Sequence, residues 1–547
     1  MKTNNILEKE YIDKGYWKDI NLGNMLRKWS SIYSEKIAVV DGDTRITYKQ
    51  LNQKVDKLVK GFKKLGLKKG DKVVLQLPNS LSFVVISFAF FKMGVIPIMA
   101  LPAHRETELK GIFETSKATT YIIKDKHLGY DYRDLARNLK RENSKIDKVI
   151  VDGEEEEFIP LKSLISNDIF VIDDIVVNDY IDDNSNVDER IDFKDIAFLL
   201  LSGGTTGIPK LIPRRHTDYL YVAETLAHKC EMDENSVYLA VLPIAHNFPL
   251  GCPGMIGTFS VGGTVVMCKA ASPDEILPLI EEEKVTMTAL VPALASICLE
   301  FLELENDFDI SSLKLIQIGG SVLDSVTAHK VMNSFNCTLQ QVYGIAEGLI
   351  CCTSIDDTKD IICNCQGKPI SLGDEVRIVN ENGEDVKKRE VGELIVRGPY
   401  TILGYYNLPI VNKKCFTNDG YYCTGDKAYI TYEGNYQIVG RIKEQINRAG
   451  EKITPSELEE LLSKHEMIKE ASVVGIKDSS LGERICAFII TDNKKLNINE
   501  IRKFLREQGL ATFKMPDQVE VIKSWPLTSV GKINKEKLKN LATKDYK

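Results

Sequence analysis

Short apolar runs alternate with amphipathic stretches over residues 35 to 110. Ile37–Val40 and Lys72–Leu77 (KVVLQL) have the length and composition of buried strands. Between them lies a stretch with helical spacing, Tyr48–Leu65, whose apolar positions are Leu51, Val55, Leu58, Val59 and Phe62. This alternation predicts β-α-β units on a largely parallel sheet, and therefore an α/β fold.

The same alternation returns after Ile196, with the apolar runs AFLLLS, VYLAVLP, GGTVVM, VTMTALVP and LKLIQIGG. Residues 152–195 are acidic and uneven, and we interpret them as a surface linker between two lobes of sheet. Near Pro369 the pattern changes to short strands with Gly and Asn turns, which is typical of a small β-rich subdomain. After Gly440 follows an α+β unit of about 100 residues, long enough for its own core. We expect a large domain over residues 1–440 and a small one over 441–547.

Length and charge narrow the class of protein. The 547 residues suggest three or four domain-sized units at ~100–200 residues each. A net charge of −7 and a pI near 5.8 argue against a nucleic-acid binder. The most apolar stretch, Phe83–Leu101, contains Lys92, Gly94 and Pro97, so it predicts a buried helix and a strand, not a membrane span. The first residues lack the apolar core of a signal peptide, and we expect a cytoplasmic protein without membrane partners.

Twelve cysteines are scattered along the chain, which favours reduced thiols that pack as small apolar groups. One cluster stands out, formed by Cys351, Cys352, Cys363 and Cys365. A metal site and a set of apolar fillers in a strand-rich segment are the two interpretations. Neither pair has the CxxC spacing of zinc sites, so the spacing favours the fillers.

The strongest local signal is a Gly-rich loop directly after the apolar strand AFLLL. Glycines bring backbone N–H groups close to phosphate oxygens, hydroxyls add donors, and a lysine adds positive charge. The loop is not a Walker A motif, because its lysine follows Pro209 and precedes Leu211. A surface loop without a ligand is the alternative. Its residues are Ser202, Gly203, Gly204, Thr205, Thr206, Gly207, Ile208, Pro209 and Lys210.

Five ordered segments resemble the core motifs of the ANL adenylate-forming enzymes, a superfamily of acyl-CoA synthetases, peptide-synthetase adenylation domains and luciferases. They are SGGTTGIPK (202–210), YGIAEG (343–348), YYCTGD (421–426), GRIKEQINRAGEKI (440–453) and PLTSVGK (526–532). Within that superfamily, AHNFPLGCPG (245–254) and QQVYGIAEGL (340–349) resemble the stand-alone aryl-acid adenylation enzymes, which are salicylate–AMP and 2,3-dihydroxybenzoate–AMP ligases.

The resemblance implies a two-step reaction that uses ATP and Mg²⁺. An aryl carboxylate attacks the α-phosphate of ATP, which releases pyrophosphate and leaves an aryl-AMP. The phosphopantetheine thiol of an aryl carrier protein then attacks the acyl carbon and releases AMP. Charge develops on phosphate and acyl oxygens in both steps, so cations and fixed donors matter more than covalent chemistry.

The resemblance also implies a role for each motif residue in ATP binding and catalysis. Lys210 and the loop would cover the β- and γ-phosphates, and Glu347 would hold Mg²⁺ as the metal ligand. Taken singly, each motif residue has an ordinary alternative as a turn, helix-end or surface residue. The remaining expected positions are Tyr343 and Gly344 at adenine, Asp426 and Arg441 at ribose, and Lys532 between the carboxylate and the α-phosphate.

Lys443 lies where the family places its hinge. There the small domain rotates after adenylation, withdraws the Lys532 loop and brings the 440–453 segment, with Gly450, to the thiol tunnel. An exposed linker lysine is the alternative for Lys443. Only 15 residues follow Lys532, so we expect the carrier protein to bind in trans.

In the aryl-acid branch, Asn247 stands where amino-acid-activating domains use an Asp to bind an ammonium, so the resemblance implies an acid without an α-amine. Cys252 stands where dihydroxybenzoate enzymes have Ser and salicylate enzymes have Cys, and a thiol is a weaker donor to a 3-hydroxyl. Ile350 stands where dihydroxybenzoate enzymes have Val, and its additional methylene narrows the pocket. We therefore favour salicylate over 2,3-dihydroxybenzoate. The rest of the expected ring site is His246, Phe248, Gly319, Gly320 and Val342.

Two other functions stay open at this point. An aryl-CoA ligase would use coenzyme A as the thiol, and CoA-dependent release of AMP would separate it from a carrier-dependent enzyme. A catalytically silent binding protein on the same fold would not need to keep Lys532, Glu347, Asp426 and Arg441, so the presence of all four argues against it.

Overall fold

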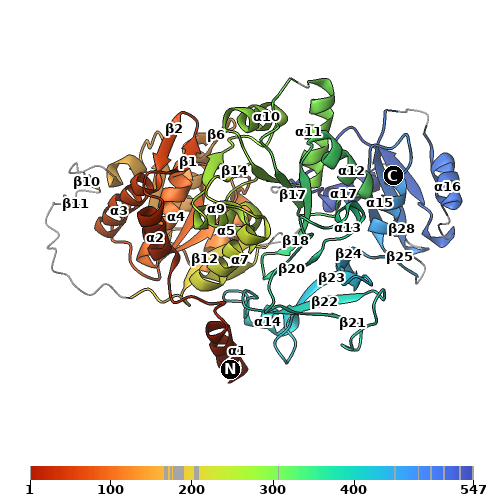
Figure 1. The fold of residues 1–547 in the computed structure, drawn as a ribbon, viewed down its shortest axis with the longest axis horizontal. Helices are drawn as coiled ribbons and strands as arrows, with labels where there is room; N and C mark the ends of the chain where they lie inside the picture. The colour runs from red at the N-terminus through yellow and green to blue at the C-terminus, as the bar shows by residue number, and fades with distance from the viewer. Residues whose placement is uncertain are drawn as a thin grey trace.

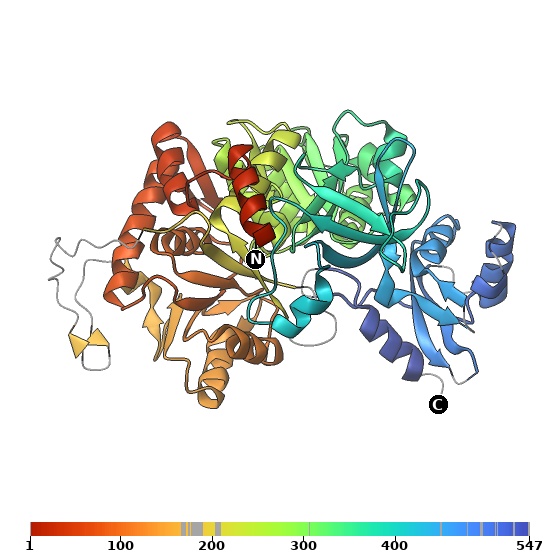
Figure 2. The same cartoon turned by 90° about the horizontal axis from the view of Figure 1, so that it is seen from below.

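The computed structural model describes residues 2–165, 171–172, 175–176, 190–202, 209–305, 307–448, 451–478, 480–492, 496–508, 510, 512–528 and 531–544. The chain forms two large sheets, a smaller antiparallel sheet and a C-terminal α+β unit. In Figure 1 the C-terminal unit (blue) lies at the right-hand end and the smaller antiparallel sheet lies at the bottom. The α/β fold with a β-rich subdomain is confirmed. Figure 2 shows the N-terminal helix α1 (Lys2–Asp13) lying against the middle of the molecule.

The larger sheet has nine strands, and its six central strands, β1, β15, β14, β16, β17 and β18, run parallel. In spatial order the strands are β2 (Thr44–Thr47), β1 (Ile37–Asp41), β15 (Thr264–Met267), β14 (Val237–Ala240), β16 (Met287–Leu290), β17 (Leu315–Gly319), β18 (Thr338–Ile345), β19 (Leu349–Cys352) and β20 (Lys368–Pro369). The carboxyl ends of parallel strands are the usual place for ligands in such sheets. Here β17 and β18 end at Gly319 and Ile345.

The second sheet has seven strands, of which only β13 is antiparallel to its neighbour. Its order is β13 (Leu211–Arg215), β12 (Ile196–Leu201), β4 (Ile96–Met99), β3 (Lys72–Gln76), β5 (Thr120–Lys124), β8 (Lys148–Asp152) and β9 (Ile159–Pro160). The expected division of the sheets at 152–195 is wrong: β1 and β2 precede this segment but join the nine-stranded sheet, whereas β12 and β13 follow it and join the seven-stranded one. Part of the expected linker, 166–170, 173–174 and 177–189, lies outside the described residues.

Helices pack between and around these sheets. The predicted helix at Tyr48–Leu65 is α3, which starts with a capping box between Thr47 and Gln50. Phe83–Leu101 forms the buried helix and strand that its sequence predicts, because α4 ends at Gly94 in the left-handed conformation and β4 follows. In the described chain, no helix is long and apolar enough to cross a bilayer. The helices after α1 are α2 (Leu22–Ile32), α3 (Tyr48–Lys64), α4 (Leu81–Met93), α5 (Glu106–Ser116), α6 (Tyr132–Glu142), α7 (His216–Lys229), α8 (Asn247–Gly251), α9 (Gly254–Ser260), α10 (Pro273–Glu282), α11 (Pro292–Leu304), α12 (Ser325–Ser334), α13 (Lys359–Asn364) and α14 (Pro409–Cys415).

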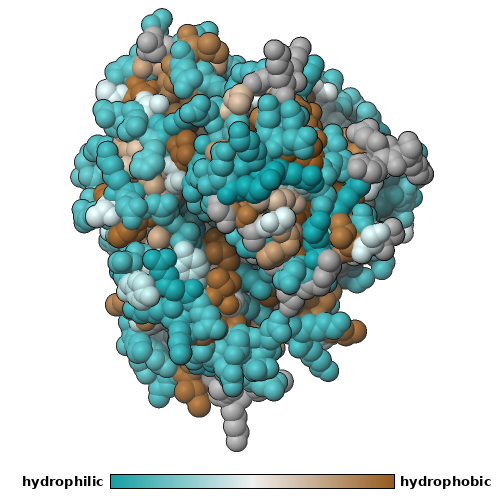
Figure 3. Space-filling view, turned by 90° about the vertical axis from the view of Figure 1, so that its right-hand side faces the viewer, coloured by the Kyte–Doolittle hydropathy of each residue, from teal (hydrophilic) through white to brown (hydrophobic). Residues whose placement is uncertain are grey.

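The remaining strands form the β-rich subdomain and the C-terminal unit. The antiparallel sheet consists of β21 (Glu375–Val379), β22 (Gly392–Arg397), β23 (Tyr422–Ile430) and β24 (Tyr436–Arg441). The C-terminal sheet contains β25 (Ile446–Arg448), β26 (Glu451–Ile453), β27 (Glu470–Asp478), β28 (Gly482–Ile490) and β29 (Gln518–Val521). Helices α15 (Pro455–Ser463), α16 (Ile498–Glu507) and α17 (Lys535–Lys544) belong to the same unit. Figure 3 shows that the face at this end of the molecule is mostly hydrophilic, with scattered apolar patches.

Candidate functional site

Three of the predicted nucleotide residues form one hydrogen-bonded network. Tyr343, near the end of β18, donates its hydroxyl to Asp426 Oδ2 at 2.6 Å, and Arg441 Nε donates to Asp426 Oδ1 at 3.1 Å. The register of β23 and β24 places Asp426 directly opposite Arg441. Burial raises the pKa of Asp426, and the opposing charge of Arg441 lowers it by less. The network brings together an aromatic ring from β18 and a carboxylate and a guanidinium from the paired strands β23 and β24, a set that suits adenine and ribose.

Glu347 is held from two sides by its backbone and its side chain. Tyr405 donates its hydroxyl to Glu347 Oε1 at 2.7 Å, and the N–H of Ile402 donates to the Glu347 carbonyl at 2.8 Å. Lys210 contacts the aromatic ring of the same tyrosine, with its Nζ 4.4 Å from the centre of the Tyr405 ring. One tyrosine therefore contacts both the carboxylate of Glu347 and the ammonium of Lys210.

The base of the predicted phosphate loop is closed by two reciprocal bonds. Ser202 N donates to the Lys210 carbonyl at 3.0 Å, and Lys210 N donates to Ser202 Oγ at 3.0 Å. These two residues extend the β12–β13 hairpin, so they set where the loop leaves the sheet. Gly203, Gly204, Thr205, Thr206 and Gly207 lie outside the described residues.

Lys532 reaches this region from the C-terminal unit. Its turn is fixed by Thr528, whose N–H donates to the Lys532 carbonyl at 2.7 Å and whose Oγ1 accepts from Lys532 N at 3.1 Å. Lys532 Cε lies 3.3 Å from the position that a Cβ on Gly320 would occupy. Because Gly320 has φ +91° and the lysine fills the space beside it, only glycine fits there without strain.

The charges around Lys532 connect it to both halves of the site. Burial, together with the positive charge of Arg441, lowers the pKa of Lys532 to about 8, against the attraction of Asp426 and Glu347. Burial and the charge of Lys532 lower the pKa of His246 to about 3, so this imidazole is neutral. The ammonium of Lys532 therefore lies within electrostatic reach of the nucleotide residues and of the predicted ring site.

Asn247 begins the short helix α8 and is fixed by two neighbours. Tyr219, on α7, donates its hydroxyl to Asn247 Oδ1 at 3.0 Å, and Asn247 Nδ2 donates to Cys252 Sγ at 3.4 Å. The amide carries two N–H groups and the thiol takes one of them, so the second can donate to a ligand oxygen. Burial raises the pKa of Cys252 to about 12, so the group beside Asn247 is a neutral thiol.

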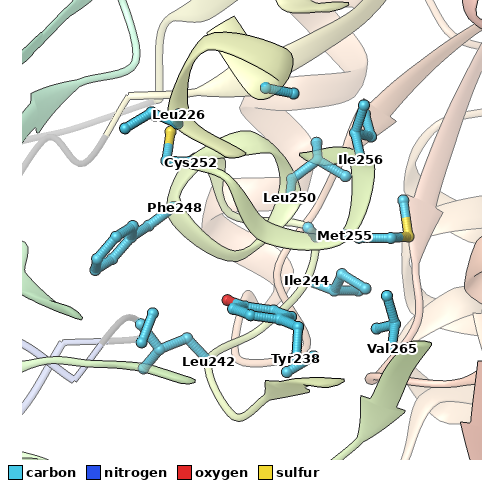
Figure 4. Close-up of a cluster of buried hydrophobic side chains, with 14 of the residues drawn as sticks. Leu226, Tyr238, Leu242, Ile244, Phe248, Leu250, Cys252, Met255, Ile256 and Val265 are labelled. Carbon is cyan, nitrogen blue, oxygen red and sulfur yellow. The ribbon is translucent and has the colours of Figure 1, made fainter. Parts of the chain in front are cut away.

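The other predicted ring residues come from α8 and from three strands. His246 precedes α8 and Phe248 lies in it, Gly319 ends β17 with Gly320 next to it, and Val342 and Ile350 lie in β18 and β19. A Cβ on Gly319 would meet the Val342 carbonyl at 2.6 Å and the Phe248 ring at 3.2 Å, so the absence of a side chain lets the aromatic ring pack against the strand. On the next strand pair, Gly344 lies opposite Ile350, whose Cγ1 is 3.4 Å from a Cβ placed on the glycine. Figure 4 shows Phe248 and Cys252 on one side of the α8–α9 segment, with Leu250, Met255 and Ile256 on its other side.

The structure adds residues that the sequence analysis did not single out. Tyr219 orients Asn247, and Tyr405 anchors Glu347 and contacts Lys210. Arg214 is the third, because it donates to the carbonyl of Ala346, the residue before Glu347, at 2.8 Å and lies 5.1 Å from the centre of the Tyr219 ring. Nothing in the sequence around these three residues distinguishes them from other tyrosines and arginines, and only their contacts in the structure indicate a role.

The expected hinge residue, Lys443, lies in the single 3₁₀ turn Ile442–Glu444 between the β-rich sheet and the C-terminal sheet, and it is exposed. A lysine on a short exposed connection between two sheets can change its backbone angles without breaking a core contact. Gly450 lies outside the described residues.

The residues present fit one magnesium ion held jointly with a substrate. Among the described residues, no three His, Cys, Asp or Glu side chains converge on a point that could hold a metal. Glu347 instead offers one carboxylate, fixed by Tyr405, beside the end of the phosphate loop. Mg²⁺ in nucleotide sites is commonly bound by one or two carboxylates, phosphate oxygens and water, and this single anchored carboxylate suits that mode.

Comparison with known proteins agrees with this site. The profile of the AMP-binding enzyme family matches residues 26–406, and that of the AMP-binding enzyme C-terminal domain matches residues 457–532. The chain is 43% identical over 533 residues to a 2,3-dihydroxybenzoate-AMP ligase of Bacillus subtilis, covering 97% of this chain and 96% of the relative. It is 39% identical to a salicyl-AMP ligase / salicyl-S-ArCP synthetase of Mycobacterium tuberculosis, covering 96% and 91%.

Among solved structures, the apo form of MbtA from Mycobacterium smegmatis superposes with a TM-score of 0.73 at 38% identity, and the match covers 97% of both chains. The family profile spans more than half of the chain, and the similarity to both relatives extends over nearly all of it. The protein is therefore an enzyme of the AMP-binding, adenylate-forming ANL family.

Proposed function

We propose that this enzyme activates a 2-hydroxyaryl carboxylic acid, with salicylate preferred over 2,3-dihydroxybenzoate, to its aryl-AMP. It then transfers the acyl group to the phosphopantetheine thiol of a separate aryl carrier protein in siderophore-type biosynthesis. The arrangement of Asn247 carries this proposal. An amide held by Tyr219 and Cys252 offers a neutral donor where an ammonium-binding carboxylate would be needed for an amino acid.

The choice of acid follows from the two ends of the ring site. Asn247 Nδ2 would donate to the 2-hydroxyl or carboxylate of the substrate. Cys252 and Ile350 are 3% and 2% exposed, so little space and only a weak donor remain for a 3-hydroxyl. The names of the two relatives include both acids, which supports the class and leaves the preference to these side chains.

In the first step the substrate carboxylate attacks the α-phosphate, and pyrophosphate leaves. Tyr343 and Gly344 would line the adenine, while Asp426 would accept from the ribose hydroxyls with Arg441 beside it. Lys532 would bridge the attacking carboxylate and the α-phosphate, because its charge acts on Asp426 and Glu347 and also on His246 of the ring site. Ser202 and Lys210, with the loop from Gly203 to Gly207, would cover the β- and γ-phosphates.

When bound, Mg²⁺ would neutralise charge on the phosphate oxygens, and Glu347 would be its protein ligand. Tyr405 keeps this carboxylate in place through its hydroxyl.

In the second step the carrier thiol attacks the acyl carbon, and AMP leaves with the former carboxylate oxygen. We propose that residues 441–547 move as a unit about Lys443, which withdraws Lys532 and opens access for the thiol. Lys532 is held by its own turn within the C-terminal unit, so moving that unit moves the lysine as well.

Exchange of radioactive pyrophosphate into ATP tests the proposed substrate class. The purified enzyme is assayed with salicylate, 2,3-dihydroxybenzoate, 4-hydroxybenzoate, benzoate and several amino acids. The strongest exchange is expected with salicylate. Exchange only with an amino acid would refute the assignment of Asn247. In a second assay, AMP release with a phosphopantetheinylated aryl carrier protein, but not with coenzyme A, is expected; release with coenzyme A alone would favour an aryl-CoA ligase.

The variant Cys252→Ser is expected to shift preference toward 2,3-dihydroxybenzoate relative to salicylate by about tenfold or more. The serine hydroxyl can form a hydrogen bond with the 3-hydroxyl of the substrate, whereas a thiol forms only a weak one. The ratio of kcat/KM for the two acids measures the shift. Cys268→Ser is the matched control, since this buried thiol donates to the Ala270 carbonyl outside the ring site. An unchanged ratio in Cys252→Ser would show that Cys252 does not select the acid.

The adenylation rate is expected to decline at alkaline pH as Lys532 loses its proton. Burial disfavours the charged lysine, so its pKa is lowered to about 8 and the active ammonium is present below this value and lost above it. A plot of kcat/KM for pyrophosphate exchange against pH should show an alkaline limb near 8. Lys532→Arg should move that limb upward, because a guanidinium stays protonated. A limb that does not move in this variant would assign it to another group.

A further inference from the structure

Cys363 does not join the other cysteines of its sequence cluster. Cys351 and Cys352 are buried within β19, paired with Tyr343 and Val342 of β18. Cys363 instead lies near the end of α13 and faces α12, the neighbouring helix in Figure 1. The cluster in the sequence therefore does not form a four-cysteine site, and the partners of Cys363 come from elsewhere in the chain.

Two soft donors from α12 meet the Cys363 thiol. Its Sγ lies 3.6 Å from His329 Nδ1 and 3.9 Å from Met332 Sδ. His329 and Met332 are three residues apart on the helix, so both side chains lie on the same face. A thiol, an imidazole nitrogen and a thioether converge here, and a thioether is not a ligand for Mg²⁺ or Ca²⁺ but is one for monovalent copper.

The separations between these atoms suit a three-coordinate ion. A d¹⁰ ion with bonds of about 2.3 Å to sulfur and about 2.0 Å to nitrogen, spread evenly in a plane, separates its ligands by about 3.7 Å (N to S) and about 4.0 Å (S to S). The two contacts of Cys363 are within a few tenths of an ångström of these values. Two of the three pairwise separations are therefore close to those of a three-coordinate site before any ion binds.

The supporting structure holds the thiol in position and leaves an entrance. Thr358 caps α13, and Gln341 Nε2 donates to the Ile362 carbonyl at 2.8 Å, directly before Cys363. Cys363 is 1% exposed, whereas His329 is exposed. A small ion can therefore reach the thiol past the imidazole, while the thiol itself is shielded from bulk solvent.

We propose that Cys363, His329 and Met332 form a binding site for one Cu⁺ ion, distinct from the adenylation site. Binding converts the thiol to a copper thiolate: the S–H bond breaks, the S–Cu bond forms, the proton passes to solvent, and no electron is transferred. His329 contributes the lone pair of Nδ1 as the nitrogen ligand. The ion connects α12 to α13 and so ties the segment after β17 to the segment after β19.

Competition for Cu⁺ under anaerobic, reducing conditions tests this site on the full-length enzyme. The protein is titrated into the coloured complex of Cu⁺ with bicinchoninate, and the loss of colour reports the copper withdrawn. We expect the wild-type chain to withdraw one tightly bound equivalent. Cys363→Ser and His329→Ala should each weaken this binding by about 100-fold or more. Cys415→Ser, which replaces a half-buried cysteine on α14, is the matched control and should bind as the wild type does.

A spectroscopic measurement identifies the ligands directly. X-ray absorption of the one-equivalent complex should show two sulfur neighbours and one nitrogen neighbour, and Met332→Leu should remove one sulfur. Circular dichroism verifies that each variant is folded, and His329→Ala is the safest of them because this side chain is exposed. Wild-type copper affinity in both Cys363→Ser and His329→Ala, or loss of the tight equivalent in Cys415→Ser, would overturn the proposal.

Discussion

Replacing Lys532 with alanine is expected to slow adenylate formation by about 10²- to 10³-fold, the usual effect of removing one preorganised group that stabilises transition-state charge. Lys532 is the cation that lies beside Gly320 and within electrostatic reach of Asp426, Glu347 and His246. The alanine variant leaves the developing negative charge on the α-phosphate without this partner. Salicylate-dependent pyrophosphate exchange measures the loss.

Two controls make the result specific. Lys523→Ala removes an exposed lysine from the same C-terminal unit and should keep full exchange activity. Transfer of the acyl group from supplied salicyl-AMP to the carrier thiol should be within a few-fold of wild type in Lys532→Ala, because we propose a role for Lys532 in the first step only. Equal loss of both steps would contradict this division of roles and would indicate a general effect on the fold.

Replacing Asn247 with aspartate is expected to reduce kcat/KM for salicylate by about 100-fold or more, because a carboxylate placed against the substrate carboxylate costs several kcal/mol. Tyr219 can still donate to one oxygen, but the N–H that faces the ligand is lost and a negative charge takes its place. The exchange assay with salicylate and with a panel of amino acids measures the change.

The alanine variant separates the effect of charge from the loss of a hydrogen bond. Asn247→Ala removes the donor without adding charge and should cost about tenfold, near the net value of one hydrogen bond. Aspartate should therefore be clearly worse than alanine at this position. If the two variants behave alike, or if Asn247→Asp retains wild-type activity, the substrate does not lie against this side chain.

Local pattern was enough to predict much of the fold. The helical spacing from Leu51 to Phe62 became α3, and Lys92, Gly94 and Pro97 marked α4 and β4 as a buried helix and strand. Pairing between distant strands was not predictable in this way. The pairing of β1 with β15 depends on contacts across more than two hundred residues, and no local signal in Ile37–Asp41 indicates which sheet the strand will join.

In the site, too, the sequence motifs indicated some of the residues, whereas others could be found only from their contacts in the structure. Asp426, Arg441 and Tyr343 belong to separate motifs, and the structure brings them into one hydrogen-bonded network. Tyr219 and Tyr405 were missed, because a tyrosine in a helix or a loop has the same local pattern whether it packs in a core or orients a polar partner. The cysteines that cluster in the sequence are apart in the fold, because Cys363 lies on helix α13 whereas Cys351 and Cys352 lie on strand β19.

The central claim is that a substrate carboxylate oxygen attacks the α-phosphate of ATP, and an oxygen-18 transfer experiment tests it most directly. Salicylate labelled with oxygen-18 in its carboxylate is incubated with the enzyme, ATP and Mg²⁺, with hydroxylamine present to cleave the adenylate at its acyl carbon. The account predicts salicylhydroxamate and AMP that carries one oxygen-18 atom. Label in inorganic phosphate with ADP as the other product, or unlabelled AMP, would contradict it.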